Sequence, residues 1–216
     1  MSKKRIAILT IALAILIDQI VKIYIKTHFV LGEEVKVFDW FRIHFVENNG
    51  MAMGFEFGGS AGKLFLTLFR LVAVAGIVYW LMSIIKKKMP NIVVIAVALI
   101  FAGAVGNIID SVFYGVIFNT PQHSVATLFA DDPYGSLFYG KVVDMFYFPI
   151  WEGNLPDWIP FVGGDFFRFF NYIFNPADSY ITVGVVLLFI FNKKAFPKEE
   201  KSTAEGTKKT EKLTTD

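Results

Sequence analysis

The chain has 216 residues, of which 55% are hydrophobic and 17% aromatic, with 24 phenylalanines and only 19% charged residues. This composition excludes an ordinary soluble domain, and a net charge of +2 gives no reason to expect a nucleic-acid partner. With no cysteine, the chain has neither a disulfide framework nor thiol chemistry.

Apolar runs in chain order predict four membrane-spanning helices, at about residues 6–25, 64–85, 91–111 and 174–193. The first three runs are long enough to cross a hydrocarbon core of about 30 Å, and the fourth needs the aromatic residues at its start. Basic clusters precede the first run and follow the second and the fourth. The positive-inside rule therefore predicts that both termini are cytoplasmic.

The expected fold class is an all-α integral membrane protein with four transmembrane helices and a small extracytoplasmic β-platform. Residues 1–196 form the membrane domain, with outer segments at 26–63 and 112–173. The polar residues 197–216 predict a disordered cytoplasmic tail.

The outer segments have different patterns. Apolar residues alternate along 35–46, which predicts a strand lying on the membrane surface. The second outer segment mixes Gly, Pro and Asp with many aromatic residues. Its part "IWEGNLPDWIPFVGGDFFRFF" predicts an interfacial loop with short amphipathic pieces.

Polar residues in or beside the expected spans share one depth, although the helices alternate in direction. They are Asp18, Lys22, Asn107, Asp110, Asp144, Asn175 and Asp178. Ionisable groups within spans are functional candidates by default. We therefore expect one polar site at the extracytoplasmic boundary.

Several of these residues also have simpler interpretations. Asp18 and Lys22, four residues apart, can form an interfacial ion pair that only sets the depth of the first span. Asn107 and Asn175 can be hydrogen-bonding contacts between helices, and Asn175 can cap the fourth helix together with the proline that follows it. Asp110 fits a cap or a supporting residue better than a catalytic group.

Small residues and histidines receive structural interpretations. Gly103 and Gly106 are expected to permit close approach of helices. His28, His44 and His123 are dispersed and lack a ligand motif, so neither a metal nor a cofactor is expected.

The remaining candidates for chemistry are carboxylates. Two carboxyl groups a few ångströms apart in a partly dehydrated site cannot both ionise, so they share a proton. One then acts as a general base on a water molecule, and the other, protonated, polarises a peptide carbonyl. This is the chemistry of aspartic proteases.

Five short motifs in order resemble those of the lipoprotein signal peptidase family (signal peptidase II): "DQIVK" (18–22), "NNGMAMGF" (48–55), "GAVGNIID" (103–110), "VVDMF" (142–146) and "FNPAD" (174–178). The resemblance implies that Asp144 and Asp178 are the catalytic residues. It implies supporting roles for Asp18, Lys22, Asn48, Gly50, Gly106, Asn107, Asp110, Asn175 and Ala177.

The resemblance further implies an aspartic endopeptidase of the bacterial cytoplasmic (inner) membrane, with several spans and an active site facing the extracytoplasmic side. Its substrate is a prolipoprotein whose lipobox cysteine carries diacylglycerol, and it cuts just before that cysteine. The expected partners are this substrate and membrane lipids, and a monomer is expected because four spans around one site need no second copy.

Two other classes of function compete with this interpretation. A small proton-coupled carrier also keeps charges within its spans, but here the polar groups gather at one face and no inverted repeat is evident. A structural subunit would leave the five motifs unexplained.

The chain departs from the family pattern in two ways. Ser111 stands where the family usually has Arg, and we hypothesise that Arg70 supplies the missing cation beside Asp110; the alternative is that Arg70 extends to the headgroups. The segments 115–141 and 147–170 are long for the family. They are candidates for a lid or for substrate-binding elements, and they leave open how the chain runs from one aspartate to the other.

Overall fold

The computed structural model describes residues 1–50, 59–120 and 124–195. Part of the motif "NNGMAMGF" and the expected cytoplasmic tail lie outside the described residues.

The helical part of the protein consists of three long helices and one shorter one: α1 (Lys3–His28), α2 (Gly59–Lys86), α3 (Asn91–Ile109) and α5 (Pro176–Ile190). The first three are long and apolar enough to cross a membrane, as the sequence predicted. The fourth expected span is an apolar helix of only 15 residues, followed by the short α6 (Asn192–Ala195). At about 1.5 Å per residue it covers about 22 Å.

The third helix continues beyond its predicted end. A π-helical turn, η2 (Asp110–Tyr114), and the short α4 (Gly115–Ile117) extend α3 to a helical run of 27 residues. Single π-turns inside helices are frequent at functional sites. Here the π-turn begins at a residue of the polar set.

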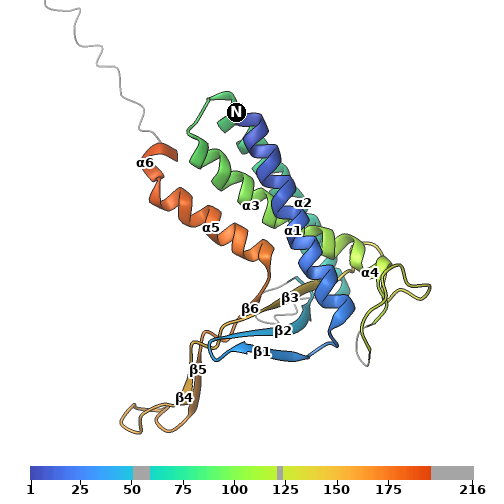
Figure 1. The fold of residues 1–216 in the computed structure, drawn as a ribbon, viewed down its shortest axis with the longest axis vertical. Helices are drawn as coiled ribbons and strands as arrows, with labels where there is room; N and C mark the ends of the chain where they lie inside the picture. Colours follow the sequence, from blue (N-terminus) through green and yellow to red (C-terminus); the bar gives the residue numbers. More distant parts are fainter. Residues whose placement is uncertain (51–58, 121–123, 196–216) are drawn as a thin grey trace, which may run out of the picture.

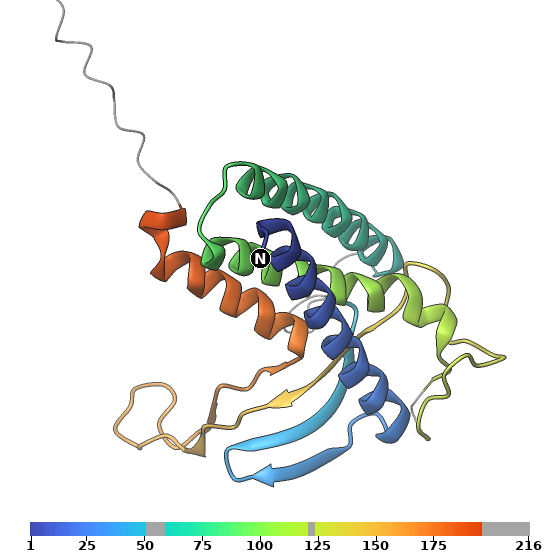
Figure 2. The ribbon, with the colours of Figure 1, turned by 45° about the horizontal axis from the view of Figure 1, so that its top comes forward.

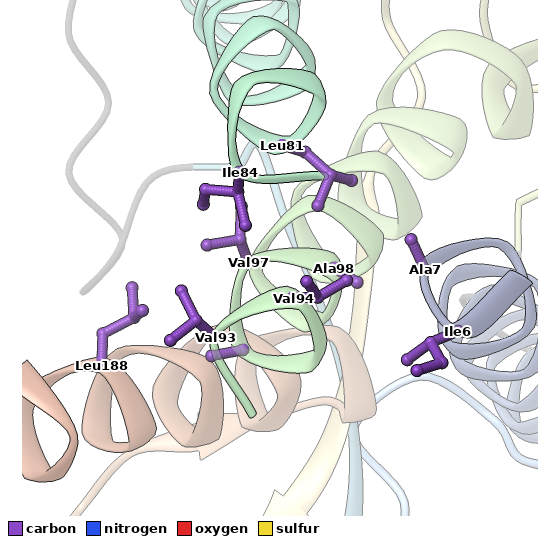
Figure 3. Packing of buried hydrophobic residues seen from close by; sticks show 10 residues of the cluster. Ile6, Ala7, Leu81, Ile84, Val93, Val94, Val97, Ala98 and Leu188 are labelled. Carbon is purple, nitrogen blue, oxygen red and sulfur yellow. The ribbon is translucent and has the colours of Figure 1, made fainter. Parts of the chain in front are cut away.

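The central helix is α3, which packs against α1, α2 and α5 (Figures 1 and 2). Away from the sheet, the four helices share an apolar core (Figure 3). Its buried members include Ile6 and Ala7 of α1, Leu81 and Ile84 of α2, Val93, Val94, Val97 and Ala98 of α3, and Leu188 of α5.

An antiparallel four-stranded sheet lies at the opposite end of the helices from the N-terminus (Figure 1). Its strand order is β1 (Glu34–Phe38), β2 (Phe41–Asn48), β3 (Val142–Tyr147) and β6 (Ile173–Phe174). Residues 35–46, predicted as one strand, are extended as expected but form the two strands of a hairpin, with a turn at Asp39 and Trp40. The motif "VVDMF" forms most of β3, a strand that the sequence patterns did not predict.

The route from one aspartate motif to the other follows from this sheet. After β3 the chain forms a separate hairpin of β4 (Trp151–Asn154) and β5 (Phe166–Phe169). It then returns to the main sheet as β6, which pairs with β3 so that Phe174 lies opposite Phe146. The chain then enters α5 at once. The two motifs therefore lie together although 31 residues separate Asp144 from Asn175.

The other long segment, 115–141, packs against the end of α3 in its described part. Backbone hydrogen bonds join Gly135 to Gly115 and Gly140 to Ser111, both at 2.9 Å. A second apolar core lies between this segment, the sheet and the end of α1. It contains Ile25, Phe45, Tyr114, Phe118, Ala126, Val143 and Met145.

Two glycines of α3 let neighbouring helices approach closely, as expected. A Cβ atom on Gly103 would lie 2.2 Å from the carbonyl oxygen of Ala177, and one on Gly106 would lie 2.5 Å from Oδ2 of Asp18. Any side chain at Gly103 would therefore push α5 away from α3.

Gly103→Ala should destabilise the protein, although Ala has the higher helix propensity. Overpacking costs about 1–3 kcal/mol, against a propensity gain of about 1 kcal/mol. Gly76→Ala in α2 is the matched control, since a Cβ there meets nothing within 4 Å. Thermal unfolding in detergent should show a lower midpoint for Gly103→Ala only. Equal midpoints for the two variants would contradict the close contact.

Candidate active site

Lys22 of α1 lies at the centre of the polar cluster and is completely buried. Its Nζ atom is 3.1 Å from Oδ2 of Asp18, 2.8 Å from Oδ2 of Asp110 and 2.8 Å from Oδ1 of Asn107. These three partners offset the cost of removing the ammonium group from water. The pair of Asp18 and Lys22 is therefore an internal link between α1 and α3, and the interpretation as an interfacial ion pair is wrong.

Gln19, which the sequence patterns did not single out, completes the cluster. Its Nε2 atom donates to Asp18 Oδ2 at 3.0 Å, to Asp110 Oδ1 at 3.1 Å and to the Gly106 carbonyl at 3.3 Å. The hydroxyl of Tyr114 donates to Gln19 Oε1 at 3.1 Å. The sequence signal for Gln19 was its position next to Asp18, an aspartate within a predicted span.

Asp110 joins this cluster to the sheet. Its Oδ2 atom accepts a hydrogen bond from the backbone N–H of Val143 at 3.4 Å, one residue before Asp144. The cation in direct contact with Asp110 is Lys22. The guanidinium of Arg70 donates to the carbonyl oxygen of Gly50 and lines the cavity beside Asp178, and whether it compensates for Ser111 stays a prediction.

Asn107 forms hydrogen bonds with both Lys22 and Asp178 and so links them. Its Oδ1 atom accepts from Lys22, and its Nδ2 atom donates to Oδ1 of Asp178 at 2.8 Å. Because an ammonium can only donate, it fixes which end of the amide faces each partner. Asn107 is thus a contact between helices and a ligand of the candidate catalytic carboxylate at once.

Asn175 is the N-cap of α5 and contacts both candidate catalytic residues. Its Oδ1 atom accepts from the backbone N–H of Asp178 at 3.0 Å, while its own N–H donates to Asp178 Oδ2 at 3.3 Å. This reciprocal pair is a capping box, with Pro176 in the first turn. The predicted cap is confirmed. The remaining donor, Nδ2, reaches Oδ1 of Asp144 at 2.6 Å.

Asp144 lies on β3, is almost fully buried, and accepts a second amide on its other oxygen. Asn48 Nδ2 donates to Asp144 Oδ2 at 2.5 Å, and Asn48 Oδ1 accepts from the Gly50 N–H at 2.6 Å. Gly50 has φ +90°, in the left-handed region that favours glycine. A Cβ at this residue would also lie 2.6 Å from a guanidinium nitrogen of Arg70. Glycine is thus required here by both conformation and space.

The environment of Asp144 favours its protonated form. Burial, and next the negative charge of Asp178, raise the pKa of Asp144 to about 7, against the hydrogen bond from Asn175, which lowers it. A carboxyl with such a pKa can hold or release a proton near neutral pH. Shifts of this kind from burial and a second carboxylate are typical of acid–base sites.

A cavity of about 180 Å³ opens beside Asp178, between α2, α3 and α5. Its walls are mainly apolar, and its polar members are Arg70, Asn107 and Asp178. The apolar lining residues are Ala73, Val74, Ala104 and Ile181. A mostly apolar cavity with a few convergent polar groups is the usual form of a ligand site.

The candidate site residues predicted from sequence lie together at one end of the helices. Ala177, fully buried, completes the set by donating its N–H to Oδ1 of Asp18 at 3.0 Å. Among residues 1–50, 59–120 and 124–195 no group of three or more His, Cys, Asp or Glu side chains could hold a metal ion. The catalytic and supporting roles of the set stay predictions.

A second buried cation near the site was also missed. Lys26 is fully buried and forms an ion pair with Glu47 of β2, with its ammonium 5.1 Å from the Phe118 ring centre and 5.0 Å from that of Tyr134. It ties the end of α1 to the sheet. The signal was its spacing of four residues from Lys22, which places both on one helix face.

Comparison with known proteins gives a consistent result. A family described as "Signal peptidase (SPase) II" matches residues 10–193. The lipoprotein signal peptidase of Porphyromonas gingivalis is 44% identical over 211 residues, covering 92% of each chain. That of Amoebophilus asiaticus is 34% identical over 206 residues, covering 92% of this chain and 82% of the relative.

A solved structure has a similar fold. It is described as a bacterial membrane enzyme determined by the in meso method at 2.3 Å resolution, and it is 26% identical with a TM-score of 0.56. The similarity covers 90% of this chain and 92% of the other.

Lys22→Met should strongly destabilise the protein. Removing the cation leaves the buried carboxylates of Asp18 and Asp110 without their counter-charge, which costs about 3–5 kcal/mol. Lys36→Met is the matched control, because Lys36 forms an exposed ion pair with Asp39. Thermal unfolding in detergent should separate the two variants by many degrees. A Lys22→Met protein as stable as the control would refute the central position of this charge.

Proposed function

Because the chain belongs to the signal peptidase II family, we propose that it is a membrane-embedded aspartic endopeptidase that removes signal peptides from diacylglyceryl-modified prolipoproteins. It cuts before the lipid-modified lipobox cysteine. The observation that carries the aspartic mechanism is the link through Asn175, which donates to Asp144 with its side chain and to Asp178 with its backbone N–H.

The two carboxyl groups have different surroundings, and this difference assigns their roles. Asp178 accepts from Asn107 on one oxygen and from the Asn175 backbone on the other, and it lines the cavity. Asp144 has its pKa raised to about 7 by burial and by Asp178. Asp178 is therefore the general base and Asp144 the proton donor.

The reaction then follows the two-carboxyl scheme. Asp178 takes a proton from water while the water oxygen attacks the scissile carbonyl carbon, and Asp144 gives its proton to the carbonyl oxygen. As the tetrahedral intermediate collapses, the proton on Asp178 passes to the leaving nitrogen and the hydroxyl proton returns to Asp144. Both carboxyl groups end in their starting states.

The arrangement of charges supports an extracytoplasmic site with both termini in the cytoplasm. Lys3 Nζ donates to Oδ1 of Asn91 at 2.5 Å, so α1 and α3 begin side by side. The N-terminus and α6 lie at the end of the helices away from the sheet (Figure 1). The basic clusters therefore gather at one end of the bundle and the polar site at the other, as the positive-inside rule requires for a site facing outward.

The short fourth helix fits this proposal. It begins at Pro176, at the level of the site, whereas α1 continues for ten residues from Asp18 to its end at His28, or about 15 Å. The sheet takes the place of the missing outer half of α5. We propose four spans in a single domain of residues 1–196 in the bacterial inner membrane, with a scissile bond that meets the carboxyls below the outer surface.

Asp144→Asn and Asp178→Asn should each abolish cleavage while the protein still folds. Loss of a general acid or base costs a factor of about 10²–10⁴. The assay is cleavage of a diacylglyceryl-modified lipobox peptide in detergent, and Asp132→Asn, an exposed aspartate, is the control. Turnover by either variant at a rate near that of Asp132→Asn would exclude the two-carboxyl mechanism.

The pH dependence should reflect the proton on Asp144. Its pKa of about 7 predicts that kcat/KM falls as pH rises through about 7, because the ionised form cannot protonate the carbonyl. Asn48→Ala removes a hydrogen bond that favours the ionised form. The substitution should therefore raise the pKa of Asp144 and move the alkaline fall of kcat/KM to higher pH, by about one pH unit.

The measurement is a pH profile of kcat/KM for both proteins with the same lipopeptide. An alkaline fall that stays in place or moves to lower pH in Asn48→Ala would show that Asp144 is not the group that titrates.

A further inference from the structure

The hairpin of β4 and β5 has two different faces. In its antiparallel register Trp151 pairs with Phe169, Glu152 with Arg168, Gly153 with Phe167, and Asn154 with Phe166. Directly paired residues point to the same side, and successive pairs point to opposite sides. One face, here called the aromatic face, therefore consists of Trp151, Phe167 and Phe169. The other face carries Glu152, Arg168, Asn154 and Phe166.

On the polar face, Glu152 is bound to the rest of the protein, whereas Phe166 is 62% exposed. Glu152 accepts from Arg168 Nε at 2.9 Å and from the Tyr147 hydroxyl at 3.4 Å, and it lies 3.9 Å from a guanidinium nitrogen of Arg42 on β2. These contacts use the side chains that face the main sheet. The aromatic face consequently points away from it.

The aromatic face is open to its surroundings. The exposed fractions are 46% for Trp151, 44% for Phe167 and 53% for Phe169, and the connecting loop adds Trp158 at 80% and Phe161 at 103%. A two-stranded hairpin is marginally stable in water, and covering its aromatic side chains would stabilise it. The exposed rings of this hairpin therefore indicate that something other than the described residues covers them.

We propose that the aromatic face and the loop of this hairpin lie in the interfacial layer of the bilayer, with lipid as their occupant. Trp and Phe are suited to this layer, where an apolar ring meets the headgroups. In both views the hairpin projects from the sheet to one side of the helices (Figures 1 and 2). Exposed Phe170 and Tyr172 continue the apolar surface from the hairpin towards α5, whose Val183 and Val186 are exposed as well.

A second copy of the chain is a poorer occupant. The three half-exposed rings and the two exposed rings of the loop together offer on the order of 700 Å², less than the about 800 Å² that a stable protein interface covers on each partner. Lipid needs no such minimum, because each ring partitions separately. The proposal does not depend on the peptidase mechanism, and its failure would leave that mechanism untouched.

The test measures quenching of Trp151 by lipids. A variant with Trp40, Trp80 and Trp158 replaced by Phe keeps Trp151 as the only tryptophan, and the protein is placed in nanodiscs with plain or brominated phosphatidylcholine. Bromine should quench at least about half of the fluorescence, and aqueous iodide should quench little. The matched control adds Trp151→Phe and Phe166→Trp, which moves the probe to the polar face, and it should show the weaker bromine and the stronger iodide quenching.

Two results would overturn the proposal. Strong iodide quenching of Trp151 without bromine quenching would place the face in water. Protection from both quenchers would mean that protein covers it, and a dimeric particle mass would then identify the second copy. A variant that keeps only Trp80 of α2, measured with and without Phe167→Ser and Phe169→Ser, reports whether the helices stay inserted when the aromatic face is removed.

Discussion

The buried ammonium of Lys22 is the interaction on which the rest of the site depends. It neutralises Asp18 and Asp110 and donates to Asn107, which in turn holds Asp178. The two neutralised carboxylates accept backbone N–H groups from the start of α5 and from β3. One charge on α1 thus positions every segment that carries a candidate catalytic group. A buried charge is a poor source of stability by itself, so its value here lies in the geometry that it imposes.

The N-terminal cap of α5 is also part of the candidate site. Asn175 caps the helix with its Oδ1, and the capping box fixes Asp178 as the reciprocal partner. The amide nitrogen that the cap leaves over is then directed at Asp144. Ala177 and Gly103 permit this because a larger residue at Gly103 would meet the Ala177 carbonyl. The carboxyl on the sheet stays buried and holds its proton, while the carboxyl on the helix faces the cavity.

Local patterns predicted most of these elements, and contacts between distant segments decided the rest. Hydropathy located three long helices, and alternation located the strands of 35–46, because both signals lie within a short window. The pattern could not show which cation reaches Asp110, since the rotation of each helix depends on packing at Gly103 and Gly106. For the same reason Gln19 and Lys26 were missed. The strand at Asp144 and the β4–β5 hairpin depend on pairing across the sheet, which no single segment reveals.

The central claim is that Asp144 holds the proton of the pair near neutral pH. Infrared difference spectroscopy of the protein in detergent tests it directly, through the C=O band of a protonated carboxyl. This band should disappear as pH rises through about 7, and it should be absent from Asp144→Asn at every pH. The same band persisting in Asp144→Asn, with the same titration, would contradict the claim and assign the proton to another residue.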